Sequence, residues 1–404
     1  MTELTAQACV AGGGPAGMML GYLLARAGVD VVVLEKHGDF LRDFRGDTVH
    51  PSTLEVMGEL GLLDDFLKRP HQRVDHLAAQ IGEETVHIGD FRRLNLRAPF
   101  IALMPQWDFL DFLVEKARAF PSFRLIMNGE VTDLIRADGR VAGAVATTPD
   151  GELRIAAPLV IGADGRQSTV RQRAGLEVED IGAPMDVLWL RLPRRGEDDG
   201  LPLGRAVAGG ILVMIPRGDY FQCGFVVPKG GWDAIRARGL EAFRSSIETM
   251  APAMRGRTAA IASWDDVKLL TVAVDRLKNW CAPGVLCIGD AAHAMSPVGG
   301  VGINLAIQDA VASANLLWAP LKAGAVSLEQ LRAVQRRREW PTKVTQAAQV
   351  FIQKQAIAPM LAGASPKRAP WPARLVDRFP PLQGLLARVV GMGVRFERVR
   401  SPAA

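Results

Sequence analysis

The sequence predicts an α/β fold in which a parallel-sheet domain is interrupted by a mainly antiparallel β-sheet domain and followed by a C-terminal helical segment. Three observations predict it. First, a glycine-rich turn joins an apolar run to a helix near the N-terminus. Second, two later apolar runs, over 159–163 and 285–288, each end in a polar turn with an aspartate. Third, residues 176–275 contain mostly short strand candidates and few helices.

Composition bounds the class of protein. The chain has 404 residues, enough for two or three domains at about 150 residues each. Hydrophobic residues make up 49% and charged residues 23%, so the chain can build a sizeable core and is not disordered. The net charge of +5 is mildly basic, which favours acidic cofactors or substrates, and nucleic acid is not an expected partner.

The cysteines and the lengths of the apolar runs indicate the cellular compartment. The four cysteines are Cys9, Cys223, Cys281 and Cys287. They form no Cys-x-x-Cys pair and have no accompanying histidine cluster, so no metal site is expected. We expect a reduced, cytoplasmic protein, because the sequence shows no signal peptide and no run of about 18 apolar residues for a stable membrane span.

The N-terminal segment has the pattern of a Rossmann-like unit. An apolar run over 6–11 predicts a buried strand, and the turn Gly12-Gly13-Gly14-Pro15-Ala16-Gly17 follows it. Residues 18–27 are predicted to form a helix that Gly28 ends, and residues 29–34 a second strand. This order predicts a dinucleotide site far more strongly than a glycine motif alone.

The glycines and the acid after the second strand have defined tasks in such a site. Gly12, Gly14 and Gly17 allow a tight turn and a close approach of a pyrophosphate to the helix N-terminus. Glu35 ends the second strand and can accept a hydrogen bond from a ribose hydroxyl. The acid favours an unphosphorylated adenosine ribose, as in FAD or NAD.

The next segment is less regular. Residues 42–47 are polar and glycine-bearing and are predicted to be a loop; the simplest interpretation of Arg45 within it is a solvated arginine. Residues 51–60 are predicted to form a helix with Ser52 or His50 near its start. Residues 69–98 are mixed, with short alternating stretches, and we expect them to enter a second sheet.

An amphipathic helix and a series of strands follow. The helix is predicted over 108–117, just after Gln106. The strand candidates are 123–127, 130–137, 140–147 and 152–155. Because Asp138-Gly139 and Asp150-Gly151 are hairpin turn signals, we expect these strands to form a small antiparallel meander.

The apolar strand over 159–163 leads into Asp164-Gly165. Ser168 is predicted to cap a helix over 169–174. In an open α/β sheet, an acidic residue at the carboxyl end of a strand lies where a ligand contact is expected, so Asp164 is a candidate binding residue.

The block 176–275 is predicted to be a mainly antiparallel sheet that forms a substrate domain. Large side chains in it are candidates for an apolar pocket, and ordinary sheet core is an equally good interpretation of each. They are Trp189, Met214, Tyr220 and Phe225.

A further strand over 285–288 leads into Gly289-Asp290, and the glycine-rich stretch 297–304 opens a helix over 305–317. Glycines before a helix let backbone NH groups approach a ligand, and the helix dipole favours negative charge there. His293 is either a catalytic base or a side chain that packs and hydrogen-bonds within the turn.

The C-terminal part is helical over 328–355, and its basic tail has a short helix over 382–390. A basic amphipathic tail can touch a membrane surface, but packing over the domain seam is the preferred interpretation. The predicted boundaries are 1–70, 99–175 and 276–345 for the nucleotide domain, 71–98 and 176–275 for the substrate domain, and 346–404 for the tail.

The three motifs resemble those of a known family. Gly12–Gly17, Asp164-Gly165, and Gly289-Asp290 with its extension over 297–304 are similar to the signatures of the class A FAD-dependent monooxygenases, which include para-hydroxybenzoate hydroxylase and the ubiquinone-biosynthesis hydroxylases. Their order and spacing are highly specific, and the resemblance covers about residues 5–345. It implies a Rossmann-like FAD-binding domain of the glutathione-reductase type, with an inserted β-sheet substrate domain.

The resemblance also implies a set of site residues around tightly but non-covalently bound FAD. Asp164 would serve both FAD and a transient NAD(P)H, and Asp290 the ribityl and pyrophosphate region. Arg45, His50 and Pro297 are implied to act in catalysis, the first and third by positioning the flavin and His50, like His293, as a proton-relay candidate. The implied cofactor-binding residues are Gly12, Gly14, Gly17, Glu35, Lys36, Arg45, Gln106, Asp164, Asp290, Pro297, Gly300, Gly302 and Asn304.

The implied reaction needs NAD(P)H and O2 as co-substrates. In such enzymes NAD(P)H reduces the flavin, oxygen adds at C4a to give a hydroperoxide, and one oxygen passes to an aromatic or polyketide-like small molecule. The chain shows no second Gly-x-Gly-x-x-Gly after a strand, in agreement with a family that lacks a separate NAD(P)H domain. The chain could form a homodimer.

Three features of the sequence depart from subgroups of this family and narrow the expected subclass. The chain has only two tyrosines, so a substrate–tyrosine relay is not expected. With 404 residues, an added thioredoxin-like domain is not expected either. Residues 210–216 lack the Trp-x-Trp-x-Ile-Pro pattern of flavin-dependent halogenases. Two other functions stay open: a reductase or oxidase of the same fold without oxygen insertion, and a non-catalytic flavin-binding redox sensor.

Overall fold

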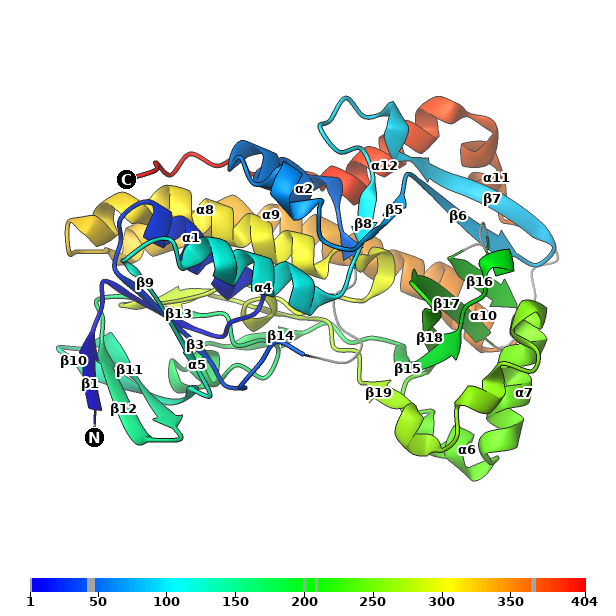
Figure 1. The fold of residues 1–404 in the computed structure, drawn as a ribbon, viewed down its shortest axis with the longest axis horizontal. Helices are drawn as coiled ribbons and strands as arrows, with labels where there is room; N and C mark the ends of the chain where they lie inside the picture. Colours follow the sequence, from blue (N-terminus) through cyan, green and yellow to red (C-terminus); the bar gives the residue numbers. More distant parts are fainter. Residues whose placement is uncertain (1, 42–47, 199–200, 202, 208–209, 365–367) are drawn as a thin grey trace.

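The computed structural model of the protein describes residues 2–41, 48–198, 201, 203–207, 210–364 and 368–404 (Figure 1). One half of the molecule is built on a mostly parallel six-stranded sheet, and the other on a seven-stranded sheet. Helices from the N-terminal, middle and C-terminal parts of the chain cover both. The predicted α/β fold class is therefore confirmed.

The six-stranded sheet carries the N-terminal motif. Every neighbouring pair of strands in it is parallel except the pair at one edge, residues 281–282 with 285–287. Its inner strands are short and fully buried, as strands covered on both faces must be. In spatial order the strands are β21 (Cys281–Ala282), β22 (Val285–Cys287), β13 (Val160–Gly162), β2 (Ala8–Ala11), β3 (Val31–Glu35) and β9 (Phe123–Met127).

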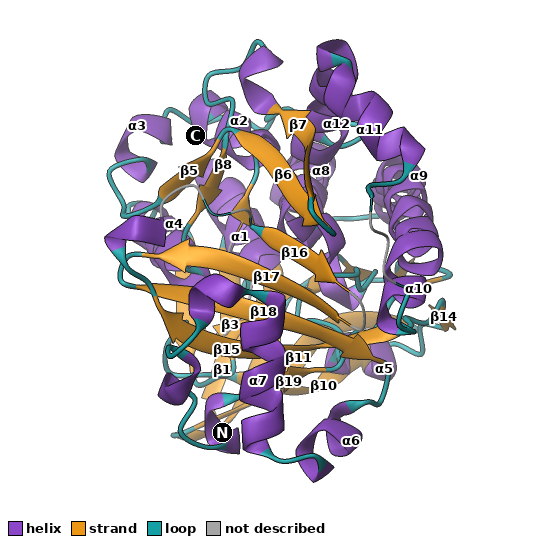
Figure 2. Cartoon of the chain, turned by 90° about the vertical axis from the view of Figure 1, so that its right-hand side faces the viewer, coloured by secondary structure: helices purple, strands orange, loops and turns teal. Residues whose placement is uncertain are grey.

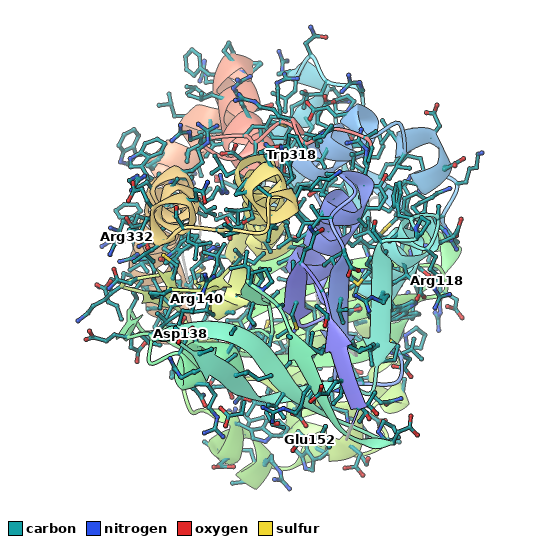
Figure 3. The ribbon with its side chains drawn as sticks, turned by 90° about the vertical axis from the view of Figure 1, so that its left-hand side faces the viewer. Arg118, Asp138, Arg140, Glu152, Trp318 and Arg332 are labelled. Carbon is teal, nitrogen blue, oxygen red and sulfur yellow. The ribbon has the colours of Figure 1, made fainter. Side chains whose placement is uncertain are left out.

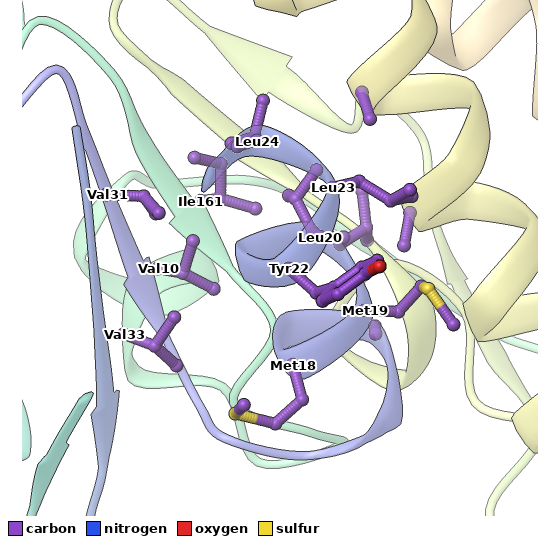
Figure 4. Packing of buried hydrophobic residues seen from close by; sticks show 14 of the residues in the cluster. Val10, Met18, Met19, Leu20, Tyr22, Leu23, Leu24, Val31, Val33 and Ile161 are labelled. Carbon is purple, nitrogen blue, oxygen red and sulfur yellow. The ribbon is translucent and has the colours of Figure 1, made fainter. Parts of the chain in front are cut away.

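Helices cover one face of this sheet (Figure 1). The first of them is α1 (Pro15–Arg26), and ten of its residues are buried between the strands and the other helices. Figure 4 shows Met18, Leu20 and Leu23 of α1 beside Val10 and Val33 of the strands. Its neighbours are α4 (Gln106–Ala117), α8 (Gly302–Lys322) and, behind α8, α9 (Leu328–Ile352).

The predicted meander is partly wrong. Its strands β10 (Glu130–Ala137), β11 (Arg140–Thr148) and β12 (Gly151–Ala156) are antiparallel as expected, and Figure 3 shows Asp138 and Arg140 at the tip of the first hairpin. Residues 123–127, however, form β9 and pair in parallel with β3. The fourth place in the meander belongs to β1 (Thr2–Thr5), parallel to β12. The alternation of side chains encodes a strand but not its partner, so the sequence could not assign this exchange.

The seven-stranded sheet combines two distant segments (Figure 2). Residues 69–98 supply its last two strands, which confirms that this segment enters a second sheet. Helices α6 (Trp232–Ala237) and α7 (Leu240–Met250) cover one of its faces. In order, the strands are β19 (Lys268–Leu270), β15 (Met185–Pro193), β18 (Tyr220–Pro228), β17 (Gly210–Arg217), β16 (Gly204–Val207), β6 (His76–Ile81) and β7 (Glu84–Asp90).

The C-terminal tail packs on both halves. Helix α9 continues through a π-helical turn over Gln353–Ile357 into the short α10 (Ala358–Leu361). Helices α11 (Trp371–Arg378) and α12 (Pro380–Met392) then lie on β7, and α12 also contacts α2 (Pro51–Glu59). The chain ends at α1, where the Ala404 NH donates to the Arg26 carbonyl at 2.8 Å. The domain boundaries stay a prediction.

Candidate functional site

The predicted motifs meet at one edge of the six-stranded sheet. Strands β2, β3, β13 and β22 run in parallel, so the residues that follow each of them lie at the same edge. These residues are Gly12 after β2, Glu35 at the end of β3, Asp164 after β13, and Gly289 with Asp290 after β22. The fold therefore brings together motifs that are more than 100 positions apart in the sequence.

The three glycines of the first motif are required for different reasons. Gly12 has φ +103°, and a Cβ there would overlap the Ala163 carbonyl of the neighbouring strand. A Cβ on Gly17 would overlap the Gly12 carbonyl. At Gly14, by contrast, a Cβ would meet nothing within 4 Å, so the fold itself does not require glycine there.

The N-terminus of α1 is open to an anion. Its N-cap residue is Gly14, no side chain caps it, and no acidic residue lies in its first turn. Its first NH groups therefore point into the open space beside Gly14, where the pyrophosphate of a dinucleotide fits the uncapped amides and the helix dipole. The residues present fit an FAD pyrophosphate.

Glu35 is held in place by its surroundings. Its side chain is buried and accepts from the Gly13 NH at 3.0 Å, while the His37 imidazole lies 2.6 Å from its other oxygen. These contacts fix the carboxylate beside the glycine turn, where a ribose hydroxyl would reach it. Lys36, the next predicted cofactor residue, is exposed.

The Asp164 carboxylate faces the helix that follows it. It accepts from the Ser168 hydroxyl at 2.5 Å and from the Val170 NH at 3.1 Å, at the start of α5 (Thr169–Arg173). Burial raises the pKa of Asp164, and these hydrogen bonds partly offset the rise. The Asp164 carboxylate thus shapes the turn, and its dual role toward FAD and NAD(P)H stays a prediction.

Asp290 has a partner that the sequence did not single out. The Arg166 guanidinium lies 3.3 Å from the Asp290 carboxylate and also donates to the Thr271 carbonyl. Both side chains of the pair are about one-third exposed, so they border open space. An arginine two residues after Asp164 was the available signal, because a cation at this edge suits a phosphate-bearing ligand.

We expect Asp290→Ala to weaken FAD binding by about tenfold or more, since a charged hydrogen-bond acceptor at the ligand would be lost. Flavin retention after gel filtration and FAD titration of the apoprotein measure the effect. Asp133→Ala is the matched control, because Asp133 pairs with Arg173 on the surface at 3.7 Å. Full FAD occupancy in Asp290→Ala would contradict the assignment of Asp290 to the site.

A second glycine turn is clamped to the segment before α2. Gly299 and Gly300 have φ of +79° and +63°, and a Cβ on Gly300 would come within 2.5 Å of the Thr48 hydroxyl. That hydroxyl donates to the Gly300 carbonyl at 2.9 Å. The Asn304 amide oxygen accepts from the His50 NH and the Thr53 hydroxyl at 2.9 and 2.8 Å.

Asn304 therefore acts through the protein, by holding the two segments on either side of the site together. Pro297 and Gly302, in contrast, are partly exposed around the turn and the start of α8. No side chain caps α8 and no acid lies in its first turn, so its NH groups suit a negatively charged ligand edge. The sequence did not single out Thr48, and its one signal was its place in the chain shortly after Arg45.

His50 is buried between α2 and α12. Its Nδ1 lies 2.9 Å from the Val390 carbonyl, and because a carbonyl only accepts, Nδ1 carries the proton in the neutral ring. Burial lowers the pKa of His50 to about 4, although the Val390 carbonyl opposes the shift. This contact ties α12 to the start of α2, and the proton-relay role of His50 stays a prediction.

The lowered pKa of His50 predicts an acid-sensitive fold. The unfolded chain takes up a proton near pH 6.5 that the folded chain takes up only near 4, so stability should fall as the pH drops through this window. The loss is roughly 3 kcal/mol. Urea unfolding from pH 7.5 down to 4.5 measures it, and His50→Gln should flatten the slope, whereas His76→Gln at an exposed position should not.

His293 belongs to a buried ion network. Its Nε2 lies 2.6 Å from Asp309, which also accepts from the Gly289 NH at 3.1 Å and from the Arg338 Nε at 2.9 Å. All three ionisable side chains are at most 1% exposed, and Glu397 completes the network beside Arg338. The geometry favours the packing and hydrogen-bonding interpretation of His293 over that of a catalytic base.

The other predicted residues of the cofactor site and of the apolar pocket lie in different surroundings. Arg45 lies outside the described residues. Gln106 is the first residue of α4 and is half-buried. Met214 and Phe225 do not line a pocket, because they are 1% and 6% exposed and pack under α7 in the core of the second sheet. Tyr220 lies under the Arg191 guanidinium at 5.2 Å.

Trp189 lies on the opposite face of the same sheet. Alternation along β15 sends Leu188 and Leu190 toward α7 and Trp189 the other way. There it packs with Val213 and Ile215 and with Leu103, which precedes α4 of the first half. An apolar sheet face therefore looks toward the nucleotide-binding half.

Comparison with known proteins gives consistent matches. A family model described as an FAD binding domain matches residues 5–348. The chain is 33% identical over 395 residues to 6-methylpretetramide 4-monooxygenase of Streptomyces rimosus, covering 97% of this chain and 94% of that protein. It is 29% identical over 324 residues to rifampicin monooxygenase of Streptomyces venezuelae, covering 76% of this chain and 62% of that protein.

A solved structure shares the fold. The structure of P. aeruginosa PqsL in complex with 2-aminobenzoylacetate superposes with a TM-score of 0.75 at 23% identity, covering 89% of this chain and 98% of that one. At this identity the match bears on the fold alone, and it agrees with the arrangement of the two sheets.

Proposed function

Because this chain belongs to the FAD-binding-domain family of class A flavin monooxygenases, we propose that it uses NAD(P)H and O2 to hydroxylate an aromatic or polyketide-like small molecule. FAD is the cofactor of the family. The observation that carries the proposal is the single sheet edge at which the glycine turn, Glu35 and Asp290 meet the open N-terminus of α1.

The chain's own residues bind and orient the cofactor. The α1 amides would hold the pyrophosphate, and Glu35 would hold the adenosine ribose. Asp290 with Arg166 would hold the ribityl and pyrophosphate region. The uncapped start of α8 would face the flavin ring, held there by the Thr48–Gly300 and Asn304 contacts. Bound flavin supplies the electron transfer and oxygen activation, which no amino-acid side chain provides.

Two observations support the substrate class. A relative that matches over nearly the full chain is named for 6-methylpretetramide, and the sheet face formed by Trp189, Val213 and Ile215 is apolar. A flat, largely apolar molecule between this face and the flavin would be shielded from water on both sides. We therefore propose a polycyclic aromatic polyketide as the substrate.

The test is NAD(P)H consumption by the FAD-loaded enzyme with a panel of aromatic polyketides. We expect a substrate to accelerate NAD(P)H oxidation and to gain one oxygen atom that carries label from isotopically labelled O2. Flavin reduction with no oxygenated product would favour a reductase or oxidase. A protein that holds FAD but is not reduced by NADH or NADPH would favour a redox sensor, and either result would contradict the proposal.

A further inference from the structure

The outer face of the two last helices exposes large apolar side chains. Trp371 is 70% exposed and Phe379 is 50% exposed, at the two ends of α11. Leu375 of α11 and Leu385 and Val389 of α12 are 42%, 56% and 44% exposed. Helix α11 has no buried residue at all.

The opposite faces of both helices anchor them to the protein, which fixes the outward direction. Asp377 of α11 accepts from the His87 NH of β7 at 2.8 Å. In α12, Ala387 is fully buried and Gly391 packs so closely that a Cβ would come within 2.9 Å of Phe91. At about 100° per residue, Leu375 lies about 160° and Trp371 about 120° around α11 from Asp377. On α12, Leu385 and Val389 each lie about 160° from Ala387. We call this outward surface the α11–α12 face.

The charges on the α11–α12 face have one sign. Arg374, Arg378 and Arg388 are exposed, and none of them forms an ion pair with a carboxylate in the part of the chain that the structure describes. Asp377 is the one acid between residues 371 and 392, and it is turned toward His87. Trp, Leu and Phe bordered by unpaired arginines are the pattern of helices that lie in a lipid–water interface.

We propose that the α11–α12 face binds the surface of an anionic lipid bilayer reversibly, with α11 and α12 parallel to the membrane plane. An anionic headgroup layer complements the three arginines, while the apolar side chains enter the region beneath it. A second copy of the chain fits less well. A two-fold interface would place the unpaired arginines of one molecule near the same arginines of the other, and these like charges repel. None of the described helices is long and apolar enough to cross a membrane, so the contact is peripheral.

The expected strength follows from the charges. Each arginine near an anionic surface contributes about fivefold, so the three together contribute about a hundredfold at low salt. The binding should weaken as salt is raised, because screening acts on exposed charges. It should be absent on vesicles of phosphatidylcholine alone, where the apolar side chains act without the arginines.

The experiment is flotation of the FAD-loaded protein with vesicles of equal parts phosphatidylcholine and phosphatidylglycerol, and with vesicles of phosphatidylcholine alone. We expect binding to the first only. Arg374→Gln/Arg378→Gln/Arg388→Gln should weaken it by about a hundredfold, and Trp371→Ser/Leu375→Ser by at least about tenfold. The controls are Leu269→Ser, an exposed apolar residue on the distant edge strand β19, and Arg336→Gln, whose partner Glu329 is also exposed.

All substituted side chains are exposed, so thermal unfolding should be unchanged. Any loss of binding then comes from the altered surface and not from unfolding. Failure of the unaltered protein to float with anionic vesicles would overturn the proposal, as would equal binding by the arginine variant. Light scattering distinguishes the alternative: a dimer that only Trp371→Ser/Leu375→Ser dissociates would assign the α11–α12 face to a second copy.

Discussion

Asp309→Ala should destabilise the protein by about 3–5 kcal/mol, the largest stability effect we expect of a single substitution. Asp309 is fully buried and accepts from the Gly289 NH, His293 and Arg338. Its removal leaves the Arg338 guanidinium, 1% exposed, with Glu397 at 3.5 Å as its one remaining counter-charge among the described residues. An uncompensated buried charge costs far more than a lost surface contact. Urea unfolding at pH 7.5, with and without FAD, measures the change.

The effect should depend on pH in a defined direction. Burial raises the pKa of Asp309, but the neighbouring His293 and Arg338 outweigh it, so the pKa lies below its usual value. A depressed carboxyl pKa contributes stability above the unfolded value of about 3.9, and that stability is lost as the pH falls below it. The gap between Asp309→Ala and the unaltered protein should therefore be full at neutral pH and shrink in acid.

Glu329→Ala is the control for Asp309→Ala. Glu329 pairs with Arg336 at 2.7 Å, but the two side chains are 68% and 60% exposed, and such pairs contribute little. We expect a change within about 0.5 kcal/mol. A loss in Asp309→Ala no larger than in this control would show that the buried network does not stabilise the fold. The Asp309 variant should also hold FAD less firmly, because the Gly289–Asp290 turn loses its anchor.

Gly14→Ala should weaken FAD binding by at least about tenfold while leaving the apoprotein as stable as before. Gly14 has φ −72° and ψ −176°, which alanine adopts without strain, and its Cβ would meet no protein atom within 4 Å. The added methyl group lies where the pyrophosphate approaches the α1 amides. Alanine even restricts the unfolded chain, so the apoprotein should be unchanged or slightly more stable.

The matched variant is Gly17→Ala, whose Cβ would overlap the Gly12 carbonyl and lie 3.2 Å from Val10. It should lower both the unfolding midpoint of the apoprotein and the affinity for FAD. FAD titration of the apoproteins, followed by flavin fluorescence, and urea unfolding separate the two effects. If Gly14→Ala bound FAD as tightly as the unaltered protein, the pyrophosphate would not lie at the start of α1.

The local elements of the nucleotide-binding half could be predicted from the sequence because each carries its own physical signal. The turn after residue 11 needs glycines, and Gly28, with φ +73°, follows the last turn of α1 as the sequence predicts. Ser168 caps α5 and accepts from the Arg171 NH at 3.0 Å, again as predicted. Such signals depend on neighbours within a few positions, so no knowledge of the rest of the chain is needed.

The partners across the fold could not be predicted. The exchange of β9 and β1 between two sheets, the Thr48–Gly300 clamp and the Arg166–Asp290 pair each join segments distant in sequence. The same holds for Asp309 and Arg338, which read as ordinary residues on helices until packing buries them together.

The sequence by itself determined the family, the cofactor and the residues at the ends of the parallel strands, because those strands end at one edge in any fold of this type. The tertiary structure decided which carboxylates stay open to a ligand and which hold the protein together. Asp290 borders open space, whereas Asp164 and Asp309 accept from the protein itself. Hydrogen-bond partners and burial set that difference, and both arise only when distant segments pack.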